Sequence, residues 1–230
     1  MEFHDDELGK IIFRRNARAK RIILRIKPDS LVITLPYLAT VKEGLDAIEK
    51  YRADLLKRRL KTAYVLLNDE TQLETRTFSV QIFHTKRSNF YFSLKDAVLH
   101  IACPENTDYA EPNVQDLLRK GIERFLRIEA KRVLPQRLQE LAQKHRFHFN
   151  QIKINSSKGR WGSCSTNKDV NLSYFLMLLP QHLIDYVILH ELTHTLEMNH
   201  SDRFWKQLDK VTDNQSLSLR KELKEYKTHI

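Results

Sequence analysis

The segment that most restricts how this chain can fold is an apolar run, residues 184–196, that carries two histidines four positions apart. His190, Glu191 and His194 form the pattern HExxH, and the apolar residues around them recur with helical spacing. Residues four apart lie one above the other on a helix, so both imidazoles can reach one metal ion, with Glu191 beside it. We therefore expect a helix over about 180–198 with a metal site on one face.

A catalytic zinc site usually has three protein ligands and one open position, so a third ligand is needed. His200 follows His194 by six residues and can return to the ion if the helix ends quickly. Asn199 is the residue best suited to a left-handed turn there, and Ser201 can cap a following helix. His200 could instead cap a helix or face solvent, and three carboxylates remain as rival ligands: Glu197, Asp209 and Asp213.

Such a ligand set predicts a hydrolase that depends on one Zn²⁺ ion, because zinc makes water nucleophilic near neutral pH and polarises a carbonyl. Glu191 is the expected general base, which takes a proton from water and delivers it to the leaving amine. A further group must stabilise the developing oxyanion. Tyr186 lies one turn before His190 and could do so, but it fits a packed aromatic equally well; Arg160 and Tyr174 are the alternatives.

The patterning along the chain predicts an α+β fold. Strands are expected at 20–26, 30–36, 78–83, 89–94, 98–103, 148–154 and 170–178. Thr40 should cap a helix to about Lys61, and a second helix from about Val114 should break or kink at Pro135 before continuing to Lys144. The polar stretch 104–112 suggests a boundary. We expect a strand-rich region over 1–105 and a metal-binding domain over 106–230.

The charge balance leaves a nucleic-acid partner open. Net charge is +10, and the cations fall into three clusters: Arg14, Arg15, Arg18, Lys20, Arg21 and Arg25; Lys57, Arg58, Arg59 and Lys61; Arg119, Lys120, Arg124, Arg127, Lys131 and Arg132. Each cluster could equally be a solvated face of a strand or helix. The two cysteines cannot form a disulfide framework, and neither a signal peptide nor a membrane-spanning run is recognisable. A cytoplasmic protein without a membrane partner is expected.

Four motifs in this order resemble the YgjP-type metallopeptidase family, which belongs with the WLM and SprT-like zincins. They are Arg160-Trp161-Gly162-Ser163-Cys164-Ser165, then Asn171-Leu172-Ser173, then residues 184–194, then Asn199-His200-Ser201 with Phe204-Trp205. The resemblance implies a zincin-like C-terminal domain, in which the HExxH helix lies beside a mixed sheet whose edge strand binds substrate.

By this resemblance, Trp161 to Ser165 would lie on or near the edge strand and bond an extended peptide through the backbone. Gly162 and Ser163 are small enough for a close backbone approach, and Arg160 and Tyr186 complete the expected substrate-binding residues. The segment could also be a structural turn with Trp161 buried. Cys164 has no assigned base and is interpreted as a small buried residue.

The function expected from these features is a zinc metallopeptidase that cleaves an extended polypeptide. Two alternatives remain. A metal-dependent nucleotide phosphohydrolase could use the basic clusters for phosphates, although the sequence has no glycine-rich phosphate loop. A nucleic-acid-associated protein, including a protease that acts near DNA, would also explain the charge, although no nucleic-acid-binding motif is recognisable.

Overall fold

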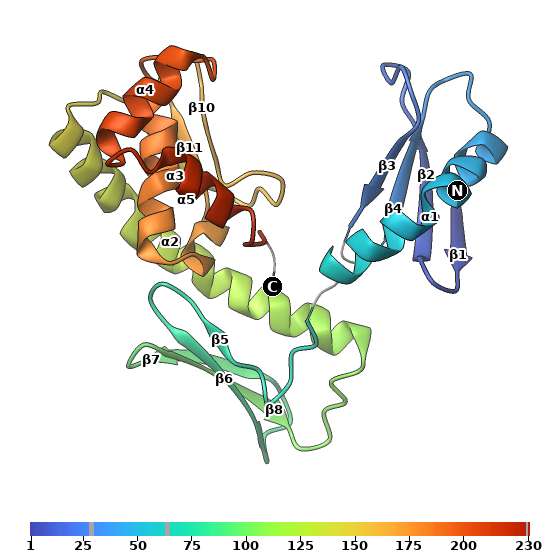
Figure 1. The fold of residues 1–230 in the computed structure, drawn as a ribbon. Helices are drawn as coiled ribbons and strands as arrows, with labels where there is room; N and C mark the ends of the chain where they lie inside the picture. The colour runs from blue at the N-terminus through green and yellow to red at the C-terminus, as the bar shows by residue number, and fades with distance from the viewer. Residues whose placement is uncertain (28–29, 63–64, 229) are drawn as a thin grey trace. The chain divides into compact units, whose positions relative to one another are not determined.

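The structure is a computed structural model that describes residues 1–27, 30–62, 65–228 and 230. The chain forms two compact units, Met1–Val65 and Leu66–Ile230, and each is described by itself. Both units combine helices with mixed β-sheets, so the fold class is α+β, as expected (Figure 1). Residues 28–29, which connect two expected strands of the first unit, lie outside the described part of the chain.

The first unit is a four-stranded mixed sheet with one helix. Its elements are β1 (Glu2–Asp5), β2 (Gly9–Arg15), β3 (Ile23–Ile26), β4 (Leu31–Leu35) and α1 (Val41–Thr62). The strand order is β1-β2-β4-β3, with β2 and β4 parallel and the outer pairs antiparallel. Alternate residues of the strands form a small core with α1: Leu8, Ile11, Phe13, Leu31, Ile33, Leu35, Ile48 and Leu55.

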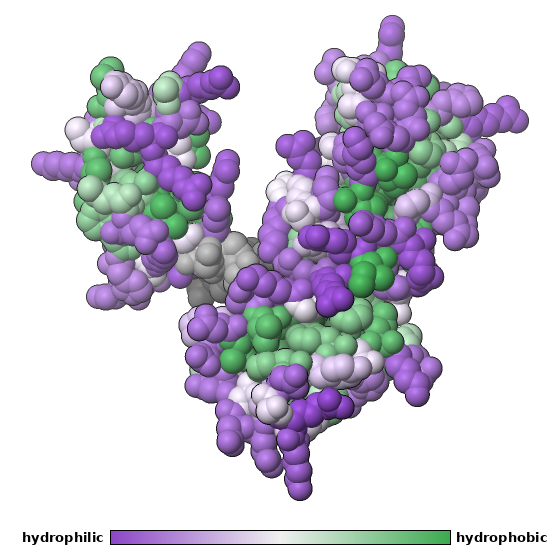
Figure 2. All heavy atoms as spheres, turned by 180° about the vertical axis from the view of Figure 1, so that it is seen from behind, coloured by the Kyte–Doolittle hydropathy of each residue, from purple (hydrophilic) through white to green (hydrophobic). Residues whose placement is uncertain are grey.

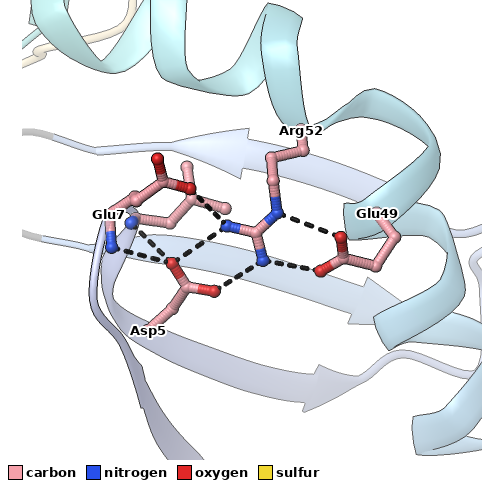
Figure 3. A network of polar contacts seen from close by, with 5 residues as sticks. Asp5, Glu7, Glu49 and Arg52 are labelled. Atoms are coloured by element: carbon pink, nitrogen blue, oxygen red, sulfur yellow. Dashed lines mark hydrogen bonds and ion pairs between the residues drawn. The ribbon is translucent and has the colours of Figure 1, made fainter.

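Polar contacts fix α1 at its start and along its length. Thr40 and Glu43 form a reciprocal cap: the Thr40 N–H donates to Glu43 Oε2 at 2.6 Å, and the Glu43 N–H donates to Thr40 Oγ1 at 3.2 Å. This confirms the cap predicted at Thr40. Further along α1, the Arg52 guanidinium lies between the carboxylates of Glu49, Asp5 and Glu7, which joins the helix to the β1–β2 connection (Figure 3).

The second unit begins with another four-stranded sheet, which packs on a long helix. The strands are β5 (Leu73–Glu74), β6 (Ser79–Thr85), β7 (Tyr91–Lys95) and β8 (Val98–Pro104), in the order β5-β6-β8-β7, and the helix is α2 (Pro112–His145). The inward side chains of β6 and β8 share one core with α2. Apolar side chains also remain visible on the surface of this part of the unit (Figure 2).

The shared core explains why the units divide between Val65 and Leu66 and not between residues 105 and 106. The polar stretch 104–112 connects β8 to α2 inside one unit. Pro135 also differs from expectation, because it lies inside a continuous α2. The apolar stripe passes straight through this position, with Ala130, Leu134 and Leu138 all fully buried, so packing on both sides of the proline outweighs its missing backbone donor.

The rest of the second unit is a small mixed sheet with a cluster of helices. The elements are β9 (Ile152–Asn155), β10 (Gly162–Cys164), β11 (Val170–Ser173), a 3₁₀ helix η1 (Tyr174–Leu178), α3 (Gln181–Thr193), α4 (Asp202–Val211) and α5 (Ser216–Leu223). β11 is central, antiparallel to β10 and parallel to β9. The strand expected to continue to residue 178 ends at Ser173, because the Ser173 hydroxyl accepts from the Phe175 N–H and caps η1.

Among the residues that the structure describes, no helix is both long enough and apolar enough to cross a membrane.

Candidate active site

The buried helix α3 carries His190, and His194 is the C-cap residue that directly follows the helix. Its side chains are apolar on nearly every side, which is typical of a helix enclosed by other elements. The helix ends at Thr193, five residues before the expected end at Met198. The Thr193 hydroxyl donates to Leu189 O and the Thr195 hydroxyl to Leu192 O, both at 2.7 Å, so side chains satisfy the last carbonyls.

The chain then turns back so that His200 reaches the other two histidines. Tight backbone bonds close the turn: Thr195 N–H donates to Leu192 O and Leu196 N–H to Thr193 O, both at 3.0 Å. Such bonds need no left-handed residue, and the prediction of that conformation at Asn199 is wrong. Ser201 does cap α4, since its hydroxyl accepts from the Phe204 N–H at 3.4 Å.

His190, His194 and His200 come together in one cluster. One nitrogen from each ring lies within 4.8 Å of the others, and the Nε2 atoms of His190 and His200 are 3.0 Å apart. His194 Nδ1 is bonded to the Glu197 carbonyl at 3.1 Å, which leaves Nε2 as its free nitrogen. Three imidazole nitrogens that converge in this way suit a zinc ion, so the residues fit the expected metal.

Burial favours the neutral forms of His190 and His194. It lowers the pKa of His190 to about 3, and the nearby positive forms of His194 and His200 add to the effect. Burial also lowers the pKa of His194. Neutral imidazole is the form that binds a metal ion, so the surroundings favour the ligand state of both side chains.

The rival third ligands lie elsewhere. Glu197 contributes its backbone carbonyl to His194, as described above, and Asp209 accepts from the Ser216 N–H at 3.3 Å. Asp213 lies in the turn between α4 and α5 with a φ of 50°. Among the described residues, the group able to hold a metal ion consists of the three histidines alone.

Aromatic and cationic side chains surround the histidines: Phe204 and Trp205, which the sequence placed in the fourth motif without a role, and Arg220, which it did not indicate. Phe204 is fully buried, and its ring centroid lies 4.6 to 4.9 Å from those of all three imidazoles. Trp205 lies 5.9 Å from His200, and the Arg220 guanidinium of α5 stacks 5.1 Å above the Trp205 ring. The charge of Arg220 also lowers the pKa of His190 and counteracts the raised pKa of Tyr186. Sequence spacing gave no signal for Arg220, because only folding brings α5 beside α3.

Glu191 is 6% exposed and packs against β10. A Cβ at Gly162 would lie 2.7 Å from Glu191 Cγ and 2.9 Å from Oε1, so only glycine leaves room for this carboxyl. Burial raises the pKa of Glu191 to about 8, and the positive charge of Arg160 opposes the rise. A cation held by the histidines would favour the carboxylate further.

β10 is an edge strand of its sheet. Toward β11, the Trp161 carbonyl accepts from Ser173 N–H at 2.8 Å, and the Ser165 N–H donates to Asp169 O at 3.0 Å. Backbone groups of alternate residues point to opposite sides of a strand in its plane, so those of Gly162 and Cys164 point to the open edge. The Cys164 side chain, expected to be buried, is half-buried, and burial raises the pKa of its thiol to about 11, which is typical of an unreactive cysteine.

The three side chains considered for stabilising the oxyanion, namely Tyr186, Tyr174 and Arg160, lie in different surroundings. Tyr186 is 3% exposed, with its ring 6.1 Å from His190, and burial raises its pKa to about 12. The Tyr174 hydroxyl donates to Glu123 of α2 at 2.8 Å, so it is engaged outside the histidine cluster. Arg160 is exposed just before β10, and Trp161 is half-buried against the main core.

Two solved structures and one protein family are similar to this chain. The solved structure of the metallopeptidase zymogen abylysin from Pyrococcus abyssi is 18% identical, with a TM-score of 0.37 over 40% of this chain and 91% of its own. The zymogen of jannalysin from Methanocaldococcus jannaschii is 23% identical, with a TM-score of 0.32 over 39% of this chain and 95% of its own. Both likenesses are distant, and no curated protein is significantly similar. The YgjP-like metallopeptidase domain matches residues 20–226, and the chain therefore belongs to the YgjP-like metallopeptidase family.

Proposed function

We propose that this metallopeptidase binds one zinc ion through His190, His194 and His200 and uses Glu191 as its general base. One observation carries the proposal: three ring nitrogens lie within 4.8 Å of one another, beside a carboxyl that is 6% exposed. The ligand set leaves a zinc coordination position open, as catalytic sites require.

Each residue then has a defined task. Zinc, when bound, would polarise a carbonyl and lower the pKa of water. Glu191 accepts a proton from the attacking water at a carboxylate oxygen and delivers it to the leaving nitrogen, which departs as an amine. The Glu197 carbonyl orients the His194 ring, since its bond to Nδ1 directs Nε2 toward the other histidines. Tyr186 is the favoured oxyanion donor because it is close to His190 and buried.

The open edge of β10 is the proposed binding site for an extended polypeptide. The backbone groups of Gly162 and Cys164 would pair with the substrate, as in other cases of strand addition to a sheet edge. Gly162 also lies against Glu191, so a substrate paired there would run beside the general base. A catalytic helix next to a mixed sheet with such an edge is the zincin arrangement, and we assign the domain to it.

Metal content and peptide cleavage test the proposal together. Elemental analysis of protein purified without added metal should find about one zinc per wild-type chain and much less in His200→Ala. Glu191→Gln should keep its zinc but lose cleavage of an unfolded, labelled polypeptide by a factor of at least about 100. Wild type that stays metal-free after zinc is added back would refute the zinc site. A Glu191→Gln variant with full activity would refute the role of Glu191.

A nucleotide phosphohydrolase is the second candidate, and one observation favours it. Arg160 and Arg220 both place positive charge near the histidine cluster, since Arg160 acts on Glu191 and Arg220 acts on His190. Arginine binds phosphate oxygens in a bidentate manner. If this function holds, zinc-loaded protein should release phosphate or pyrophosphate from nucleoside triphosphates, Arg220→Gln should lower that rate, and peptide cleavage should be absent.

We also propose action in a reducing compartment such as the cytoplasm. Cys103 and Cys164 are both free thiols, and neither contributes a disulfide to the fold.

A further inference from the structure

The sheet of the first unit has one face that α1 does not cover. Its register places Arg14 beside Thr34 of β4, and Thr34 beside Ile23 of β3. Two residues further along the strands, Ile12 of β2 lies beside Val32 of β4, and Val32 lies beside Arg25 of β3; these three residues form a second row on the same face. The alternate residues on these strands, such as Phe13 and Ile33, belong to the core under α1, so Arg14 and Arg25 lie on the opposite face. Both arginines are exposed, and Ile23 on the same face is 38% exposed.

This face carries a concentration of unpaired positive charge. Residues 8–28 contain eight Lys and Arg and no Asp or Glu. Lys10 pairs with Glu2 at 2.9 Å. Within the described chain, no carboxylate forms an ion pair with the other exposed cations of this face and its β2–β3 connection, namely Arg14, Arg18, Lys20, Arg21 and Arg25.

Glu2 lies on the same face, opposite Ile12, and its partner is Lys10, whereas other carboxylates of the unit are gathered elsewhere. Asp5, Glu7 and Glu49 surround Arg52 near the start of β2 (Figure 3). Arg14 and the cations of the β2–β3 connection lie at or beyond the other end of that strand, and Arg25 lies in the row of Ile12, near the middle of the strand. The cluster on α2 differs, because Lys120 pairs with Asp116 and Arg132 with Glu129. Among the described residues, Arg14, Arg25 and the cations of the β2–β3 connection are therefore left without a carboxylate partner, which favours an anionic ligand.

An exposed aromatic ring lies at the basic end of the same sheet. The Arg15 guanidinium donates to the carbonyls of Tyr37 and Ala39 at 2.6 and 3.0 Å, which ties the β4–α1 connection to the end of β2. Tyr37 is 72% exposed and Leu38 is 90% exposed. The Asn16 N–H donates to Leu35 O at 3.0 Å, so Tyr37 lies at the end of the sheet where the β2–β3 connection begins. An exposed aromatic ring at this end of the sheet suits an unstacked base.

We propose that the first unit binds single-stranded nucleic acid on this face. Arg14, Arg25 and the cations of the β2–β3 connection contact phosphates, and Tyr37 stacks on a base. Duplex is disfavoured because its bases are already stacked on each other. This site is independent of the histidine cluster and of the proposed peptidase activity.

The charge requirement is tested with a labelled single-stranded oligonucleotide and the full chain. Fluorescence anisotropy measures their binding at several salt concentrations. Arg14→Gln/Arg25→Gln should weaken binding about tenfold or more, and the slope of log K against log salt should fall by about 1.4, since each phosphate contact contributes about 0.7. Lys42→Gln/Lys57→Gln is the matched control: it removes the same charge from exposed positions on α1 and should change affinity less than about twofold. Equal losses in both variants would overturn the proposal.

Substitutions at Tyr37 test stacking without a change of charge. Tyr37→Phe should bind as wild type, and Tyr37→Ala should bind at least about fivefold more weakly. Equal binding by Tyr37→Ala and Tyr37→Phe would overturn the stacking role, and tighter binding of duplex than of single strand would overturn the preference. If polyglutamate displaces the oligonucleotide as well as unlabelled oligonucleotide does, at equal charge concentration, the face binds acidic polypeptide and the proposal is wrong.

Discussion

Gly162 of β10 and Glu191 of α3 are in direct contact, and the absence of a side chain at residue 162 is what makes room for the Glu191 carboxyl. A Cβ at this position would approach Glu191 Cγ to 2.7 Å. The sequence suggested that this glycine lets a substrate approach the strand closely. The structure adds a second reason, which is that the glycine sets the position of the expected general base. The edge strand and the catalytic helix are thereby joined.

Gly162→Ala should therefore impair catalysis and leave the metal site intact. The added methyl group displaces the Glu191 carboxyl, and a displacement of about 1 Å can lower kcat about 100-fold. Zinc content by elemental analysis should stay at the wild-type level. Gly159→Ala is the control, since no atom lies within 4 Å of its added methyl group and kcat should stay nearly unchanged. A wild-type kcat in Gly162→Ala would contradict the assigned role of Glu191.

Phe204→Leu should weaken zinc binding while the protein stays folded. The Phe204 ring supports all three imidazoles, and leucine preserves an apolar, buried side chain at a cost below about 1.5 kcal/mol. Competition with a chelator should show a loss of zinc affinity of about tenfold, in the range found when groups that orient metal ligands are changed. Phe175→Leu, at an equally buried position in η1, should leave zinc affinity unchanged. Equal affinities in both variants would show that Phe204 does not orient the ligands.

Gly9→Ala should destabilise the first unit. Gly9 has a φ of +65°, and a side chain in that conformation costs about 1–2 kcal/mol. The added Cβ would also meet the Arg59 guanidinium at 2.5 Å, although this flexible group can move aside. Denaturant unfolding should measure the loss of stability, and hydrogen exchange of the amides in the first unit should assign the loss to that unit. Gly159→Ala, with no atom within 4 Å of the new methyl group, serves as the control and should be nearly neutral. Equal stabilities in the two variants would exclude strain at Gly9.

The stability of the first unit should decrease in acid through Asp5. Hydrogen bonds from Arg52, and from the backbone N–H groups of Leu8 and Glu7, hold the pKa of Asp5 well below its usual range. A folded-state pKa below the unfolded one adds stability that is complete above the unfolded pKa of about 3.9 and is lost as pH falls below it toward the folded pKa. Hydrogen exchange of amides in this unit, measured from about pH 6 to 3, should show the loss.

Asp5→Asn should reduce this acid dependence, because the titrating carboxyl is removed. Glu2→Gln should leave the acid dependence unchanged, since the Glu2 side chain is 60% exposed and makes a single ion pair, with Lys10. An acid dependence in Asp5→Asn equal to that of wild type would assign it to other carboxylates.

Local patterns in the sequence predicted most of the regular elements. Thr40 and Glu43 are three residues apart and cap α1 as expected, because both partners of the cap lie in one short segment. Errors arose where distant packing decided the outcome. Pro135 has a strong local tendency to break a helix, yet the core contacts of Leu134 and Leu138 keep α2 continuous. Residues 174–178 have strand-like composition but form a 3₁₀ helix within the main core.

The sequence by itself determined the family and the candidate chemistry of this protein. Four ordered motifs predicted the YgjP-like family that the match over residues 20–226 confirms, and the spacing of His190 and His194 placed two rings on one helix face. Tertiary structure alone decided the rest. It turned His200 back to the cluster, placed Gly162 against Glu191 and brought Arg220 beside Trp205. These contacts join residues on different elements, and their geometry depends on how the whole core packs, which no local pattern encodes.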